Sequence, residues 1–168
     1  MAVFTKISNK EINYIENQFA FKKIIKFKGI KKGIENTNYL ILTKNKKYIL
    51  TIFEKRIHGG CKYKDLTFFT KLMAKLSKSN IKCPKPIKNR KGNYIFKIKN
   101  KNACIVSFLN GKDKEQLSAQ DCFVVGKNIA KFHKVSAKIK LYRKNTLAVN
   151  SWARLLSKID NRINKVSK

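Results

Sequence analysis

The sequence predicts an α+β fold, in which a five-stranded antiparallel sheet with one inserted helix is followed by further helices. Five short runs are rich in β-branched and aromatic residues, which is typical of strands. Longer segments instead repeat apolar residues every three or four positions, as amphipathic helices do. The length of 168 residues fits one domain or two small lobes, and the 43% hydrophobic content excludes a disordered basic tail.

The N-terminal part is expected to form a helix and three strands. Ser8-Asn9-Lys10-Glu11 matches a capping box, so a helix is predicted over about residues 9–18. Three strand-like runs follow, at Lys22–Ile30, Thr37–Thr43 and Tyr48–Phe53. Lys44-Asn45-Lys46 separates the last two runs and predicts a tight hairpin.

A second helix and two further strands complete the predicted sheet. From Asp65 to about Ser77, apolar residues recur on one side at helical spacing. Cys83-Pro84-Lys85-Pro86 ends this region, because each proline biases its predecessor towards extended geometry. The two strands are expected at Tyr94–Ile98 and Ala103–Leu109, joined by Lys99–Asn102.

The C-terminal part predicts helices. Ser118-Ala119-Gln120-Asp121 is a second capping-box pattern. The helix after it carries an apolar face made of Val124, Val125, Ile129, Phe132 and His133. A histidine on such a face is usually packed and hydrogen-bonded, so His133 is expected to be structural rather than catalytic. A final helix is predicted to begin at Ser151.

The formal net charge of +31 at first indicates a polyanionic partner, either nucleic acid or an anionic membrane. However, Lys supplies 35 of the 40 basic residues, and these are spread along the whole chain. Nucleic-acid binders tend to gather basic residues on one face and to use Arg for bidentate contacts. We therefore interpret the charge as AT-rich coding plus solubility, with nucleic acid bound only nonspecifically through charge.

Composition also bears on the cellular compartment. No apolar run approaches the length of a membrane span, and the first residues do not resemble a signal peptide, so a cytoplasmic protein without membrane partners is expected. The four cysteines have neither zinc-site spacing nor an obvious disulfide pattern. Cys61, Cys83, Cys104 and Cys122 are therefore predicted to be buried, reduced thiols.

One loop offers a candidate phosphate site. Gly29 and Gly33 lie between two predicted strands, where glycines allow backbone amides to approach a phosphate. The alternative is a loop whose glycines only satisfy a positive φ. His58 precedes Gly59-Gly60 in a loop that we expect to be mobile. No catalytic triad, paired carboxylates or metal-ligand cluster emerges from the sequence.

Two strings are especially informative, Glu35-Asn36-Thr37-Asn38-Tyr39 and Val106-Ser107-Phe108-Leu109-Asn110-Gly111. Further strings accompany them in order over nearly the whole chain: Phe27-Lys28-Gly29-Ile30, Tyr48–Glu54, Asp65–Phe69, Cys83–Ile87, Gly126–His133 and Arg143–Leu147 with Trp152. Together they resemble the homoserine kinase family, which has the fold of aminoglycoside phosphotransferases and protein kinases.

The resemblance implies a kinase-like N-lobe over residues 1–110 and the first helices of a C-lobe over residues 111–168. It implies ATP-dependent phosphorylation of the L-homoserine hydroxyl in threonine biosynthesis, with ATP and Mg²⁺ as cofactors. The loop from Gly29 would cover the triphosphate, and the segment after the last strand would bind adenine through its backbone. Thr51 stands where many kinases of this fold carry a phosphate-binding lysine. The implied nucleotide-binding residues are Gly29, Gly33, Asn36, Thr37, Asn38, Thr51, Ser107, Phe108 and Leu109.

In that family the proton-accepting Asp and the metal ligands follow the helix of Trp152, whereas this sequence ends at Lys168. We therefore expect no catalytic or metal-binding residue here, and a truncated kinase that is inactive alone. Three origins are considered: a truncated gene, an N-terminal piece complemented by a separate C-terminal half, or a repurposed non-catalytic domain. The alternative functions are a basic nucleic-acid-binding module and a kinase-like protein acting on another small hydroxyl compound.

Overall fold

The computed structural model describes residues 3–54, 63–145 and 148–157. In chain order the elements are α1 (Asn9–Phe19), β1 (Ile24–Gly29), β2 (Thr37–Thr43), β3 (Lys47–Ile52), α2 (Tyr63–Lys78), β4 (Ile95–Ile98), β5 (Lys101–Ser107), α3 (Ala119–Ser136), a 3-10 turn (Val149–Ser151) and α4 (Trp152–Leu156). The strands form one sheet in the order β1-β2-β3-β5-β4, with every neighbouring pair antiparallel. The predicted α+β architecture is confirmed.

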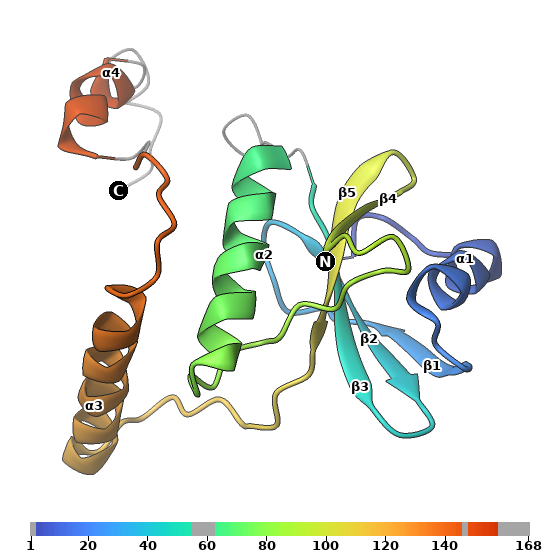
Figure 1. Cartoon of the computed structure of the whole chain (residues 1–168), viewed down its shortest axis with the longest axis horizontal. Coiled ribbons are helices and arrows are strands. Elements are labelled where there is room, and N and C mark those ends of the chain that lie inside the picture. The colour runs from blue at the N-terminus through green and yellow to red at the C-terminus, as the bar shows by residue number, and fades with distance from the viewer. Residues whose placement is uncertain (1–2, 55–62, 146–147, 158–168) are drawn as a thin grey trace, which may run out of the picture.

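Local sequence signals place most of these elements. The capping box of α1 forms, because the Ser8 amide donates to Glu11 Oε2 at 2.8 Å, and the helix ends at Ala20 in the left-handed region. β2 has the predicted bounds, whereas β5 begins and ends two residues earlier than predicted. The chain leaves the sheet after Ser107 and continues as an extended connection to α3 (Figure 1).

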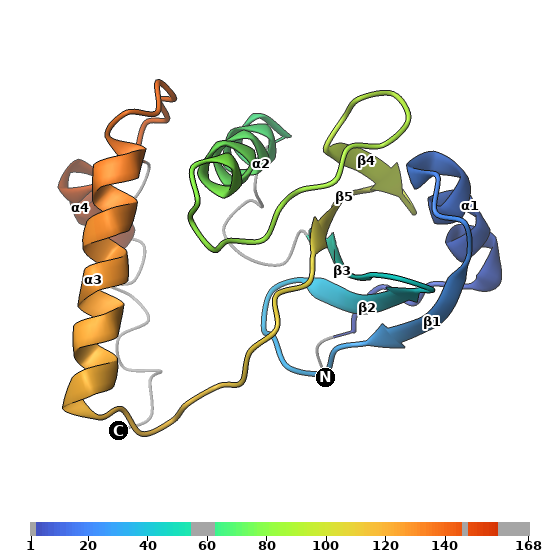
Figure 2. The same cartoon turned by 60° about the horizontal axis from the view of Figure 1, so that its bottom comes forward.

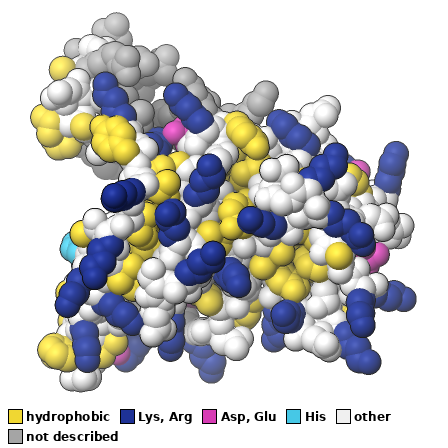
Figure 3. All heavy atoms as spheres, in the orientation of Figure 1, with side chains coloured by type: hydrophobic (Ala, Val, Ile, Leu, Met, Phe, Trp, Pro, Cys, Tyr) yellow, Lys and Arg dark blue, Asp and Glu magenta, His cyan; other side chains and the backbone are white. Residues whose placement is uncertain are grey.

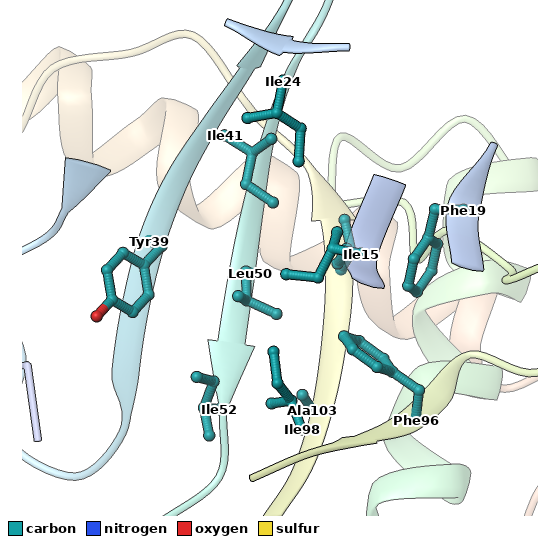
Figure 4. Packing of buried hydrophobic residues seen from close by; sticks show 11 residues of the cluster. Ile15, Phe19, Ile24, Tyr39, Ile41, Leu50, Ile52, Phe96, Ile98 and Ala103 are labelled. Carbon is teal, nitrogen blue, oxygen red and sulfur yellow. The ribbon is translucent and has the colours of Figure 1, made fainter. Parts of the chain in front are cut away.

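The sheet buries apolar side chains on both faces. On one face α1 covers the larger core, whose buried members are Ile15, Phe19, Ile24, Tyr39, Ile41, Leu50, Ile52, Phe96, Ile98, Ala103 and Ile105. Figure 4 shows Leu50 of β3 in the middle of this cluster. On the other face α2 contributes Leu66 to a smaller cluster with Ile95, Cys104 and Val106. Figures 1 and 2 show the two helices on opposite sides of the sheet.

Helix α3 lies beyond α2, away from the sheet, and contributes little to the core (Figure 2). Its predicted capping box is present, but no residue of α3 is buried. Ile129 and Phe132 on the predicted apolar face are 50% and 37% exposed. The Lys131 ammonium donates to the Asn80 carbonyl at 2.9 Å, linking α3 to the end of α2.

Three sequence predictions fail around this helix and the cysteines. His133 is exposed rather than packed, since no described element covers its side of α3. Cys122 is exposed for the same reason, and Cys83 is only half-buried. Cys104 is buried as expected, and burial raises the pKa of its thiol to about 12. Cys61, His58 and Gly59-Gly60 lie outside the described residues.

Basic side chains are scattered over the face shown in Figure 3, across all the elements visible there, rather than gathered over one of them. Among the described residues, no helix is long and apolar enough to cross a membrane.

Candidate functional site

The α2-facing surface of the sheet carries two rows of side chains. Because directly paired residues of antiparallel strands share a face, the pairings Asn38–Thr51 and Thr51–Cys104 define one row. The pairings Leu40–Ile49 and Ile49–Val106 define a second, wholly apolar row. The rows are two residues apart along each strand, or about 7 Å.

The first row has a polar end. Thr51 Oγ1 donates to Asn38 Oδ1 at 2.8 Å, and both side chains are half-buried. Asn38 is the second residue of β2, so this pair lies close to the β1–β2 loop, in which a phosphate site is predicted. The Thr51 hydroxyl is therefore bonded to a neutral amide side chain. A lysine at this position, which the resemblance implies for many kinases of this fold, would instead bring a positive charge.

The apolar row ends at the segment Ser107-Phe108-Leu109. The Ser107 amide donates to the Lys85 carbonyl at 2.8 Å, and the Phe108 amide donates to the Lys47 carbonyl at 3.1 Å. The amides of Ser107 and Phe108 thus already donate hydrogen bonds within the protein. Leu109 is 46% exposed, and its amide donates to no other described residue. Of the three predicted adenine-binding residues, only Leu109 offers an amide for a ligand.

The connection from Ile30 to Asn36 is closed at its base by the hydrogen bond from the Ile30 amide to the Asn38 carbonyl, at 2.8 Å. Residues 31–35 are exposed. Gly33 has a φ of 135°, which lies in a region that residues with a side chain rarely adopt. The exposed loop therefore presents backbone amides in a conformation that depends on glycine.

Two of the predicted site residues face the opposite side of the sheet. The pairing of Gly29 with Tyr39 places both on the α1 face, and a Cβ at Gly29 would lie 2.8 Å from Val3 Cγ2. Thr37 is fully buried, and its hydroxyl donates to Glu54 Oε1 at 2.7 Å. The close packing against Val3 thus accounts for a glycine at position 29, and the Thr37 side chain bonds within the protein interior.

Glu54 is the centre of a buried polar cluster that we call the Glu54 network, made of Thr5, Thr37, Glu54 and Lys101. Its carboxylate accepts hydrogen bonds from the other three residues and forms an ion pair with Lys101. Burial by itself would raise the pKa of Glu54, but these hydrogen bonds and the Lys101 charge outweigh it and lower the pKa.

This lowered pKa predicts a specific loss of acid stability. A carboxyl with a folded-state pKa below its ordinary value of 4.5 stabilises the fold above that pH, and this contribution disappears as pH falls through the folded-state pKa. We expect the free energy of unfolding to decline below about pH 4.5 and the decline to be smaller in Glu54→Gln. Urea unfolding at a series of pH values measures it; parallel pH curves for the two proteins would contradict the prediction.

One cation on the site surface was not predicted. Lys28 pairs with Leu40 across β1 and β2, so it shares a face with the apolar row, and it is exposed. The alternation of apolar and basic residues within Lys22–Ile30 was the signal that could have revealed it. Within the described ranges, no three His, Cys, Asp or Glu side chains gather in a way that could hold a metal ion. The described residues therefore do not fit a magnesium site by themselves.

An open hollow of about 420 Å³ lies elsewhere, lined by Phe4, Thr5, Lys6, Lys99 and Lys101. None of the nine predicted nucleotide-binding residues lines it. The candidate site is instead the sheet surface between the β1–β2 loop and Leu109.

Comparison with known proteins identifies the family. Residues 26–164 match the phosphotransferase enzyme family, which covers most of the chain, including the sheet and α3. The chain belongs to this family.

Curated proteins that resemble this chain are homoserine kinases. A homoserine kinase of Methylorubrum populi is 30% identical over 167 residues, which is 99% of this chain and 51% of the relative. A homoserine kinase of Parvibaculum lavamentivorans is 36% identical over 155 residues, covering 92% of this chain and 47% of the relative. The chain therefore spans about half the length of the curated relatives it matches.

Solved structures of two phosphotransferases have a fold similar to that of this chain. A spectinomycin phosphotransferase in complex with ADP and spectinomycin matches with a TM-score of 0.64 and 15% identity, over 95% of this chain and 48% of that protein. An amicoumacin kinase in complex with AMP-PNP, Ca²⁺ and Ami matches with a TM-score of 0.65 and 11% identity, over 97% of this chain and 55% of that protein. At these identities the likeness shows the fold.

Proposed function

We propose that this chain forms the nucleotide-binding part of a homoserine kinase, an ATP-dependent enzyme that phosphorylates the L-homoserine hydroxyl. One observation carries the proposal: a single sheet surface has an apolar row that leads to the segment of Leu109 and, about 7 Å away, a second row whose polar end, Asn38 and Thr51, lies beside a glycine-containing loop. ATP has the same polarity, with an apolar base at one end and phosphates at the other. The homoserine kinase relatives support the choice of substrate.

At the apolar end, the base would lie against Leu40, Ile49 and Val106 and accept a hydrogen bond from the Leu109 amide. At the polar end, the exposed amides of residues 31–35 and the Lys28 ammonium would face the phosphates. Asn36, Asn38 and Thr51 would fix the loop base and the strand beside it, since their side chains bond to neighbouring residues. Gly33 would permit the loop conformation.

Phosphoryl transfer also needs magnesium ligands and a group that accepts the hydroxyl proton. We propose that a second polypeptide segment, equivalent to the other half of the relatives, supplies both. Residues 1–110 would then form the nucleotide lobe, and residues 111–168 would begin the lobe that the second segment completes. The exposed apolar face of α3, including Val125, Ile129 and Phe132, supports this proposal because it offers a surface for packing.

The proposed function is tested by calorimetric titration of the chain with Mg-ATP, alone and mixed with the C-terminal half of the Parvibaculum homoserine kinase. We expect ATP to bind to the mixture, and homoserine to be phosphorylated faster than small amino alcohols. Phosphorylation of an amino alcohol in preference to homoserine would replace the proposed substrate. Absence of nucleotide binding in a mixture shown to associate would refute the assignment.

Two substitutions of Leu109 test the proposed hydrogen bond to adenine. Leu109→Pro removes the amide that we assign to adenine, whereas Leu109→Ala keeps this amide and removes only a half-exposed side chain. The proline variant should bind Mg-ATP about ten-fold more weakly, as expected for one lost hydrogen bond. The alanine variant should bind within about two-fold of the parent protein. Equal affinities of the two variants would contradict the assigned contact.

A further inference from the structure

The N-terminal segment Val3–Thr5 contacts both ends of the candidate phosphate loop. At the start of the loop, Val3 packs so closely against Gly29 that an added Cβ would approach Val3 Cγ2 to 2.8 Å. At the end of the loop, Thr37 Oγ1 accepts hydrogen bonds from the amides of Phe4 at 2.9 Å and Thr5 at 3.0 Å. Contacts between residues 26 to 33 positions apart in the chain thus hold the loop where it begins and where it ends.

The Glu54 network holds this segment in place. Thr5 Oγ1 donates to Glu54 Oε1 at 2.5 Å and accepts a hydrogen bond from Lys101 Nζ at 2.7 Å. The Tyr39 hydroxyl donates to the Thr5 carbonyl at 2.8 Å. The amide, the hydroxyl and the carbonyl of Thr5 are therefore all hydrogen-bonded to residues of the sheet or to Glu54.

Glu54 also contacts the loop directly through its backbone. Its amide donates to Asn36 Oδ1 at 3.2 Å, while its carboxylate accepts from the Thr37 hydroxyl at 2.7 Å. Glu54, which lies two residues after the end of β3, thus bonds to the last residue of the loop and to the first residue of β2. Residues 31–35 make no comparable buried contact among the described residues and are exposed.

We propose that Thr5 and Glu54 are positioning residues, which hold the two ends of the loop through the N-terminal segment and thereby set its conformation for phosphate binding. This inference rests on the proposed nucleotide site. An anion bound by backbone amides gains most when these amides already point at it, because no ordering cost is then incurred on binding. Both residues bond to Thr37, whose side chain lies on the face of the sheet opposite the proposed nucleotide site, so their effect on binding would pass through the loop.

The test uses three variants of the full chain. Thr5→Val removes the hydroxyl at nearly constant volume, and Thr5→Ser restores it. Thr70→Val is the matched control, because Thr70 is also buried but its hydroxyl donates to the Leu66 carbonyl within α2, away from the loop. Amide hydrogen exchange of Ile30 and Glu54, whose amides bond at the two ends of the loop, reports on loop anchoring without any ligand. Thermal unfolding and Mg-ATP affinity are measured in parallel.

In Thr5→Val, we expect exchange at Ile30 and Glu54 to rise about ten-fold and Mg-ATP affinity to fall by a similar factor, with recovery in Thr5→Ser. Thr70→Val should lower the melting temperature comparably without changing exchange at these amides. If Thr5→Val and Thr70→Val alter exchange and affinity alike, the positioning role is wrong and Thr5 is merely structural. If the parent protein binds no Mg-ATP in the complemented mixture, the proposed function fails, while the exchange measurement still decides whether Thr5 anchors the loop.

Discussion

Replacing Glu54 by alanine is expected to lower the free energy of unfolding by roughly 3 kcal/mol, one of the two largest effects that we predict for a single substitution. The Glu54 side chain is 3% exposed, and its carboxylate accepts hydrogen bonds from Thr5, Thr37 and Lys101. Its removal leaves the Thr5 and Thr37 hydroxyls without their acceptor, and the Lys101 ammonium loses its ion-pair partner and keeps its hydrogen bond to Thr5 Oγ1. Because the Lys101 side chain is 34% exposed and can turn to water, the loss should lie at the lower end of the range for broken buried ion pairs.

Urea denaturation followed by circular dichroism measures this loss at pH 7. Glu115→Ala is the matched control, since Glu115 is also a glutamate but is exposed in the connection before α3. The control should change stability by no more than about 0.5 kcal/mol. A Glu54→Ala protein as stable as the control would show that the network contributes nothing net to folding.

Leu50→Ala is expected to lower the free energy of unfolding by about 2–5 kcal/mol. Leu50 is fully buried on β3, the central strand, and lies among the side chains that α1 packs against (Figure 4). Truncation removes apolar contacts and leaves a cavity that a sheet bonded on both sides of β3 cannot close. The expected drop is a large part of the stability of a protein of this size.

The matched control for this core truncation is Ile25→Ala on the edge strand β1, where the isoleucine side chain is 65% exposed. Both variants lose an aliphatic side chain from the same sheet, so the difference in their unfolding free energies isolates the effect of burial. A difference of less than about 1 kcal/mol would contradict the packing described here.

Much of the fold could be predicted because short sequence patterns determine where its helices and strands begin and end. Capping boxes at Ser8 and Ser118 mark the starts of two helices, and β-branched runs mark β2 and β3 almost to the residue. These signals depend on contacts within a few positions of the chain. The sequence predicted an antiparallel sheet of five strands, but the order β1-β2-β3-β5-β4 was not predicted, because it depends on pairing between strands that are far apart in the chain.

The site was predicted less well, because the face on which a strand residue lies depends on long-range pairing. Thr37 and Asn38 are adjacent in sequence, yet Thr37 bonds to the N-terminal segment, whereas Asn38 faces Thr51 on the other side. Lys28 was overlooked because its role depends on its pairing with Leu40. The exposure of His133 could likewise not be predicted from a local pattern, since a helix face is buried only if another element covers it.

The positions of the two edge strands give the abundant lysine a physical consequence. Unpaired strand edges are templates on which further chains can add, which leads to aggregation. β1 exposes Lys26 and Lys28, and β4 has only four residues, with Lys97 exposed among them. Short, positively charged edges repel identical edges of neighbouring molecules. Lysine gained through coding bias would therefore also keep this sheet from polymerising at high concentration.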